Sequence, residues 1–128
     1  MSTQNIAESP VLSTEELNEL ILEAIQDIKG KNIMKINLTK VDDAPTDFFI
    51  ICEGESTTQV NAIASNISRK LRKEAGIKPS HTEGTRESRW ILVDYFNTIV
   101  HVFHPEAREY YDIEDLWSDG DFTEYQDL

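Results

Sequence analysis

The sequence predicts an α+β domain with a mixed β-sheet, and three observations support this fold class. Two long segments carry apolar residues at three- and four-residue spacing, which is typical of amphipathic helices. Four shorter segments are rich in apolar and β-branched residues and lie between turn signals, as strands do. A chain of 128 residues is long enough for one such domain with a packed core.

The first helix is expected to begin at Ser13. Ser13 and Glu16 have the spacing of a capping box, which satisfies two backbone N–H groups at a helix start. The apolar stripe that follows consists of Leu17, Leu20, Ile21, Ala24, Ile25 and Ile28. Gly30 stands where a C-terminal cap is expected. Residues 1–12 are polar and aperiodic, so they are predicted to form a disordered N-terminal tail.

Two strands and a second long helix follow in the sequence. The segment Ile33–Leu38 alternates apolar and polar residues, which predicts a strand with one buried face. The segment Phe48–Cys52 is apolar throughout and predicts a central strand, buried on both faces. Ser56 and Gln59 form a second capping pattern, and Gly76 is expected to end the helix that begins there.

The next part of the chain predicts a β-hairpin. The stretch His81–Ser88 is polar and contains a glycine, so a loop or an irregular edge is expected. Trp90–Tyr95 and Ile99–Phe103 read as antiparallel strands joined by a turn near Asn97.

A short helix is predicted after the hairpin, from Pro105 to Tyr111. Leu116 and Trp117 are expected to pack back on the body of the domain, which would span residues 13–117. Residues 118–128 are rich in carboxylates and are expected to form an acidic C-terminal tail. The predicted order is therefore α-β-β-α-β-β-α.

The charge balance restricts the class of partner. The chain has 24 acidic and 12 basic residues, a formal net charge of −12. Phosphates and acidic lipid headgroups are repelled by such a surface, so little direct nucleic-acid binding and no membrane binding are expected. A basic protein is the partner that this charge favours. The chain has no secretory signal and no long apolar run, which predicts a cytoplasmic location.

Residues for catalysis or cofactor binding are not apparent in the sequence. Cys52, the single cysteine, lies in an apolar strand, and burial there would raise its thiol pKa and keep it inert. His101 and His104 would leave opposite faces of a strand, so the three histidines do not make a zinc-ligand set. No glycine-rich phosphate loop is present. No catalytic residue, metal or cofactor is therefore predicted.

One segment has the outline of a nucleotidyltransferase. A strand leads through Gly54-Glu55-Ser56 into a helix N-terminus, which could hold a phosphate. Such enzymes then need a pair of carboxylates for two metal ions, and residues 63–69 contain none. The sequence favours this outline without the metal chemistry, and a divergent nucleotidyltransferase remains an alternative.

A binding surface is predicted on the sheet. Two long helices can cover one face of a four-stranded sheet, while the short last helix covers little of the other. Trp90, Leu92 and Asp94 share one orientation on their strand and are expected on this open face. Exposed aromatic surface ringed by charge is typical of interaction sites. The alternative is that Trp90 belongs to an ordinary core.

Several ordered motifs resemble the Iojap family, the ribosomal silencing factors. The segment Asp47–Ser56, with the sequence DFFIICEGES, is similar to the D-Y-F-V-I-C-S-G-x-S stretch of that family. The match continues in Arg89–Tyr95 and is strongest in His101–Tyr111, followed by Leu116-Trp117. The resemblance covers about residues 13–117. Phe96 and Glu55 depart from it, since small residues are usual at both positions.

The resemblance implies a function in translation. Such proteins dock on the large ribosomal subunit, against its fourteenth protein, which is basic; they block joining of the small subunit and repress translation. Organellar members instead support assembly of the large subunit, which is a second alternative. The family fold is similar to nucleotidyltransferases without their activity, and homodimers occur. We expect the partner-binding residues to be Glu83, Trp90, Leu92, Asp94, Arg108 and Tyr111, with Arg108 pairing either within the domain or across the interface.

Overall fold

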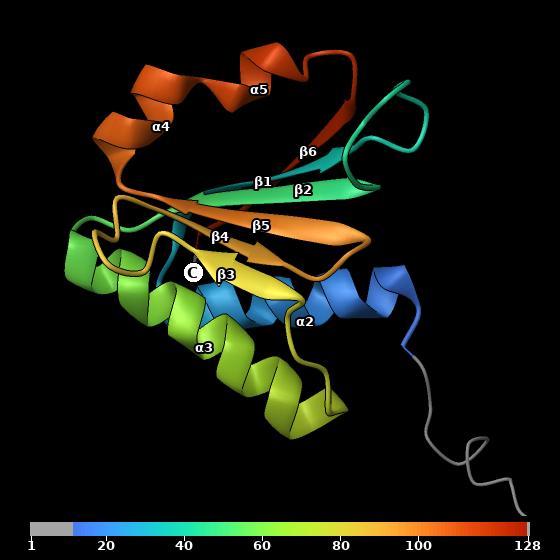
Figure 1. Cartoon of the computed structure of the whole chain (residues 1–128). Helices are drawn as coiled ribbons and strands as arrows, with labels where there is room; N and C mark the ends of the chain where they lie inside the picture. Colours follow the sequence, from blue (N-terminus) through green and yellow to red (C-terminus); the bar gives the residue numbers. More distant parts are fainter. Residues whose placement is uncertain (1–11, 128) are drawn as a thin grey trace, which may run out of the picture.

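The computed structural model describes residues 12–127, which form a six-stranded mixed sheet with helices on both faces (Figure 1). The strand order across the sheet is β3-β4-β5-β2-β1-β6. The strands are β1 Lys31–Asn37, β2 Phe48–Glu53, β3 His81–Glu83, β4 Trp90–Asp94, β5 Thr98–Phe103 and β6 Asp121–Tyr125. The α+β fold class predicted from the sequence is confirmed.

The centre of the sheet is a parallel pair. Strands β2 and β5 run parallel, with Ile50 opposite Val100, whereas all other neighbouring strands are antiparallel. Parallel neighbours need a long crossover connection, and the helix between β2 and the β4–β5 hairpin provides it. Four residues of β2 are buried, as predicted for a central strand covered on both faces, and all six residues of β5 are buried as well.

Helices α2 (Thr14–Asp27) and α3 (Thr57–Ala75) cover one face of the sheet (Figure 1). Both predicted N-terminal caps are present, because the hydroxyls of Ser13 and Ser56 each accept a backbone N–H three residues on. The reciprocal bond of a capping box forms at Ser13, whereas the side chain of Gln59 accepts from Glu55 and not from Ser56. Gly76 ends α3 with a φ of 67°, the left-handed conformation that glycine adopts without strain. The apolar stripes of both helices pack on the sheet and form the larger core.

Helix α2 ends differently from the prediction. Lys29, with a φ of 62°, takes the left-handed position that was expected at Gly30. Gly30 is buried, and a Cβ there would collide with the side chain of Ile25. A glycine is therefore needed at this position for close packing and not for its backbone angle.

The other face of the sheet is better covered than expected. Helices α4 (Pro105–Tyr111) and α5 (Ile113–Leu116) lie over it (Figure 1). They enclose a second, smaller core with the buried residues Ile36, Leu38, Phe49, Ile51, Ile99, Phe103, Ala107 and Ile113. Trp117 packs edge-on against Phe49 at 5.9 Å between ring centroids, whereas Leu116 is 73% exposed. The prediction that Leu116 packs on the body was therefore wrong.

The C-terminal segment is a strand and not only a tail. Asp121–Tyr125 pairs antiparallel with β1, with Phe122 opposite Ile36. The segment contains the strand-favouring residues Phe122, Thr123 and Tyr125, and β1 offers an open edge for them. The domain therefore extends past residue 117. A disordered N-terminal tail was predicted for residues 1–12. Residues 1–11 of that segment lie outside the described residues.

Within residues 12–127, none of the helices combines the length and apolar character that crossing a membrane requires. The polar stretch from His81 begins with the three-residue edge strand β3, which pairs only with β4.

Candidate functional site

An aromatic cluster surrounds Trp90 at the start of β4. Its ring stacks on Phe103 of β5 at 4.9 Å and contacts Tyr111 of α4 at 4.7 Å between centroids. The indole N–H donates to Nδ1 of His101 over 3.0 Å. Trp90 is only half-buried, so it contributes both to the second core and to the surface. The role of Trp90 in partner binding stays a prediction.

His101 is the hydrogen-bond partner of Trp90. Burial lowers the pKa of His101 from 6.5 to about 4, so the ring is neutral at pH 7. A neutral ring can accept at Nδ1, which is the role that the bond from Trp90 requires. Nε2 is buried and has no hydrogen-bond partner within residues 12–127. The imidazole therefore positions the indole through this hydrogen bond.

Four of the predicted partner-binding residues lie on strands β3 and β4. Trp90, Leu92 and Asp94 alternate along β4 and point to one side of the sheet. Glu83 of β3 is directly paired with Leu92 and shares that side. Tyr111, 53% exposed, adds to this surface beside Trp90. We call the surface of Glu83, Trp90, Leu92, Asp94 and Tyr111 the docking face.

The carboxylates of the docking face contact one histidine. His81 lies opposite Asp94 in the register, with its Nε2 at 2.9 Å from Glu83 and its Nδ1 at 3.7 Å from Asp94. Asp94 also accepts the backbone N–H of Phe96 over 2.7 Å. The edge of the sheet therefore presents two oriented carboxylates beside an apolar patch. His81 was not among the residues predicted from the sequence.

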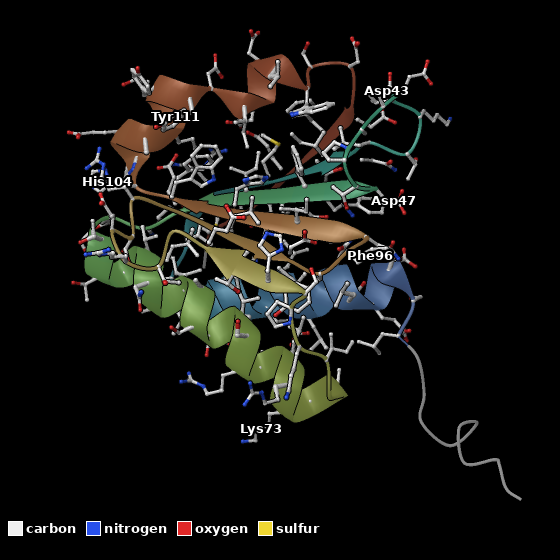
Figure 2. The ribbon with its side chains drawn as sticks, viewed as in Figure 1. Asp43, Asp47, Lys73, Phe96, His104 and Tyr111 are labelled. Atoms are coloured by element: carbon white, nitrogen blue, oxygen red, sulfur yellow. The ribbon has the colours of Figure 1, made fainter. Side chains whose placement is uncertain are left out.

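An open groove of about 440 Å³ adjoins the aromatic cluster. Tyr110, 80% exposed, and Tyr111 line it from α4, and Trp90 lines it from β4. Figure 2 shows Tyr111 on α4, at the end of the sheet opposite to Phe96 in the β4–β5 turn. The adjacent tyrosines at the end of a short helix were the sequence signal for this groove, and only Tyr111 was predicted.

Arg108 lies apart from the docking face, in a network within the domain. Its guanidinium donates twice to Glu114, over 3.0 and 2.8 Å, and once to Glu53 over 3.1 Å. It also donates to the carbonyl of Asn32 over 2.6 Å. Burial lowers the pKa of Arg108, but the hydrogen bond and charge of Glu114 and the charge of Glu53 outweigh it and raise the pKa overall. Of the two expected pairings, the structure shows the one within the domain.

In the nucleotidyltransferase-like segment, backbone N–H groups near the start of α3 donate to side chains of the same segment. Ser56 accepts the N–H of Gln59, and the side chain of Gln59 accepts the N–H of Glu55 over 2.7 Å. Cys52 is fully buried, and burial raises its pKa to about 12. No group of three or more potential metal ligands occurs within residues 12–127.

The fold and surface define a small domain with a six-stranded mixed sheet and with aromatic and acidic side chains exposed on one side of it. Comparison with known proteins places it more closely: the family described as "Ribosomal silencing factor during starvation" matches residues 11–128. The chain belongs to this ribosomal silencing factor family.

Individual relatives agree with this assignment. The chain is 37% identical over 115 residues to Ribosomal silencing factor RsfS of Halalkalibacterium halodurans, covering 90% of this chain and 97% of the relative. A crystal structure of a Chromobacterium violaceum protein is 39% identical, with a TM-score of 0.79, and covers 84% of this chain and 88% of that one. The mouse protein named Mitochondrial assembly of ribosomal large subunit protein 1 is 32% identical over 78 residues, 57% of this chain and 33% of its own length.

Proposed function

We propose that this protein binds the large ribosomal subunit through a basic ribosomal protein, keeps the small subunit away by its bulk and so represses translation. The observation that carries the proposal is the docking face, an aromatic and aliphatic patch beside two carboxylates. Buried aromatic anchors with a charged rim are common in protein interfaces. The fourteenth large-subunit protein, implied by the family resemblance, has the matching basic charge.

The charge distribution supports a basic partner. Between residues 106 and 127 nine side chains are acidic and one, Arg108, is basic. The acidic residues are Glu106, Glu109, Asp112, Glu114, Asp115, Asp119, Asp121, Glu124 and Asp127. Most of them are exposed, and those on and just after α4 lie on the side of the sheet that carries the docking face. A field of one sign steers an oppositely charged partner toward this side and speeds association.

The proposed mode of action is steric and requires no catalysed reaction. Cys52 and His101 are buried, and the high pKa of the one and the low pKa of the other leave both uncharged at pH 7. We therefore propose a binding protein and not an enzyme. Incubation with nucleoside triphosphates and magnesium or manganese should give no nucleotidyl transfer, and turnover that survives repurification would restore the enzymatic alternative.

Support of large-subunit assembly is the second candidate function. The observation in its favour is the resemblance to the mouse mitochondrial assembly protein. The two functions predict different defects in cells that lack the protein. Immature large subunits would favour assembly, whereas mature subunits with unrestrained translation during starvation would favour silencing.

Sedimentation with purified ribosomal subunits tests the proposal. The protein should sediment with the large subunit, remain absent from the small one and lower the yield of joined ribosomes. Sedimentation with neither subunit, or normal joining in its presence, would refute the proposed function.

Variants of the docking face make the test specific. Trp90→Ala should weaken binding by about 2 kcal/mol or more if it is an anchor, but it also removes packing in the second core. Tyr111→Ala and Glu83→Lys change exposed side chains, so each should weaken binding while the fold is kept. Phe122→Ala, which truncates a 40% exposed aromatic on the opposite edge strand, is the matched control. Wild-type binding by both Tyr111→Ala and Glu83→Lys would place the interface elsewhere.

A further inference from the structure

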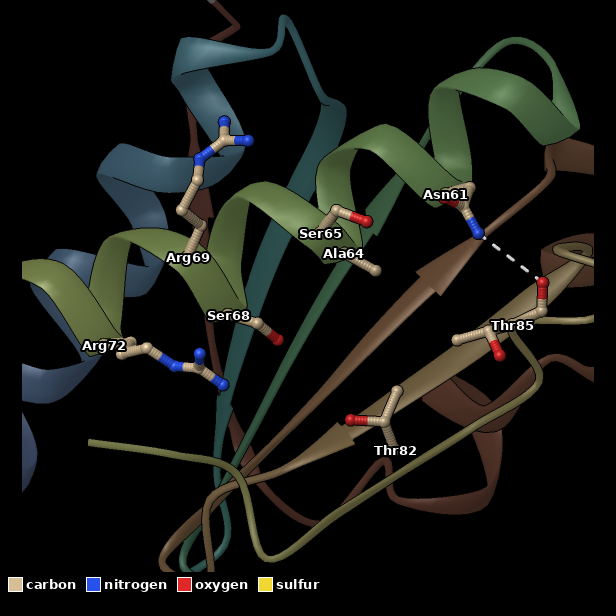
Figure 3. Close-up of a pocket in the computed structure, with 8 residues that line it drawn as sticks. All are labelled: Asn61, Ala64, Ser65, Ser68, Arg69, Arg72, Thr82 and Thr85. Carbon is tan, nitrogen blue, oxygen red and sulfur yellow. Dashed lines mark hydrogen bonds between the residues drawn. The ribbon is translucent and has the colours of Figure 1, made fainter. Parts of the chain in front are cut away.

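A cleft of about 330 Å³ lies between α3 and β3, on the side of the sheet that α2 and α3 cover (Figure 3). Its lining includes Ser65, Ser68, Arg69 and Arg72 from α3, and Thr82 and Thr85 from β3 and the loop after it. We call it the α3–β3 cleft. Thr82 and Glu83 are neighbours on one strand and point to opposite sides, so the cleft and the docking face are separate surfaces.

The lining of the α3–β3 cleft has the opposite charge to the protein as a whole. The chain has twice as many acidic as basic residues, yet the cleft is lined by two arginines and no carboxylate. Acidic side chains on α2 and α3 instead surround Lys70, whose ammonium lies 2.9 Å from Asp27 and 3.5 Å from Glu23. Within residues 12–127, Arg72 takes part in no ion pair.

Three polar groups face one another across the cleft. Figure 3 shows the guanidinium of Arg72 extending from α3 toward β3, with the hydroxyl of Ser68 beside it and the hydroxyl of Thr82 opposite. Ser68 and Arg72 are four residues apart, which places them on one face of the helix. Arg69 points away from Thr82, and its guanidinium donates to Asn66 over 2.7 Å, so it stands at the rim.

A buried hydroxyl lies behind this group. Tyr95 is 7% exposed, and its side chain belongs to the larger core. Burial raises the pKa of Tyr95, and hydrogen bonding with the side chain of Ser68 opposes that rise.

Hydrogen bonds join the two walls of the cleft at one end. Asn61 of α3 donates to Ser88 over 3.2 Å and lies 3.5 Å from the carbonyl of Thr85. Ser88 in turn donates to the same carbonyl over 2.9 Å. These contacts hold the loop after β3 against α3, so the cleft is formed before any ligand arrives.

From these observations we infer that the α3–β3 cleft binds a small phosphorylated molecule, with its phosphate held by Arg72 and by the hydroxyls of Ser68 and Thr82. Arginine and hydroxyl donors without a competing carboxylate are the groups that recognise phosphate. A volume of about 330 Å³ is at the lower end of small-molecule sites and suits a compact ligand such as a nucleoside monophosphate. The overall charge of −12 disfavours a nucleic-acid chain, whose phosphates extend beyond the cleft.

Titration of the isotope-labelled full chain, followed by amide NMR shifts, tests this inference. The probes are inorganic phosphate, guanosine 5′-monophosphate and a ten-nucleotide single-stranded RNA. The first two should shift amides around Ser68, Arg72 and Thr82, with tighter binding of the nucleotide. Shifts at these amides with the RNA but not with the nucleotide would overturn the small-molecule assignment, as would no saturable shift with either small probe.

Matched variants distinguish a specific binding site from general electrostatic attraction. Arg72→Gln should weaken nucleotide binding about tenfold or more, as expected for loss of a charge-assisted hydrogen bond. Thr82→Val keeps the shape of the side chain, removes its hydroxyl and should also weaken binding. Lys73→Gln removes the same charge from the next residue, which is exposed and does not line the cleft, and should bind like the wild type. Equal loss in Arg72→Gln and Lys73→Gln, or no loss in Arg72→Gln, would overturn the inference.

Discussion

Replacing Arg108 with methionine should destabilise the domain more than any change of an exposed ion pair. The arginine side chain is 10% exposed, and its partners Glu53 and Glu114 are 16% and 23% exposed. The substitution removes three hydrogen bonds to carboxylates and one to the carbonyl of Asn32. It leaves two partly buried carboxylates that repel each other without the cation between them.

The magnitude follows from the degree of burial. Removing one partner of a buried ion pair costs about 3–5 kcal/mol. Because Glu53 and Glu114 keep some contact with water, part of this cost is offset, and we expect the free energy of unfolding to fall by about 2–4 kcal/mol. Arg89→Met is the matched control, since Arg89 and Glu106 form an exposed pair at 3.4 Å and its loss should cost at most about 1 kcal/mol.

Urea denaturation at pH 7, followed by far-ultraviolet circular dichroism, measures both variants. The midpoint for Arg108→Met should fall while the slope stays unchanged, which indicates a change in stability and not in the extent of unfolding. Adding Glu114→Gln and Glu53→Gln should recover part of the loss, because the uncompensated charges are removed. If Arg108→Met costs no more than Arg89→Met, the network does not hold the domain together as argued.

Two further predictions concern buried titratable groups. The folded-state pKa of His101 is about 4 and lies below the unfolded value of about 6.5, so the unfolded chain binds the extra proton first. Stability should therefore be full above pH 6.5 and fall by up to about 3 kcal/mol as the pH drops toward 4. Urea titrations across this range should show a weaker pH dependence in His101→Gln, which keeps an acceptor for Trp90; an unchanged dependence would contradict the argument. For Cys52, with a pKa of about 12, iodoacetamide at pH 8 should label the thiol only after unfolding, and rapid labelling of the native protein would show that it is accessible.

Much of the fold could be predicted because local signals were strong and agreed with one another. The capping pairs at Ser13 and Ser56, the apolar stripes of the two long helices and the apolar run of β2 each report on neighbouring residues in the chain. The β6 strand could not be placed in the same way. Its residues favour extended structure, but only the open edge of β1, more than 80 residues earlier in the chain, turns that preference into a sheet strand.

The candidate site likewise contains residues that local sequence patterns could place and one, Arg108, whose role they could not decide. Alternation along one strand was enough to put Trp90, Leu92 and Asp94 on a common side, since side chains of a strand point alternately to its two faces. The role of Arg108 depended on Glu53 and Glu114, which lie 55 and 6 residues away in the chain.

The sequence by itself determined the fold class, the main helices and strands, the acidic character and the family, because these follow from local periodicity, charge and ordered motifs. Only the tertiary structure decided that α4 and α5 roof the second face, that Trp90 is shared between core and surface, and that Arg72 and Thr82 face one cleft. The physical reason is that contacts between distant segments depend on how sheet edges pair and helices dock, and periodicity along the chain carries no information about those distances.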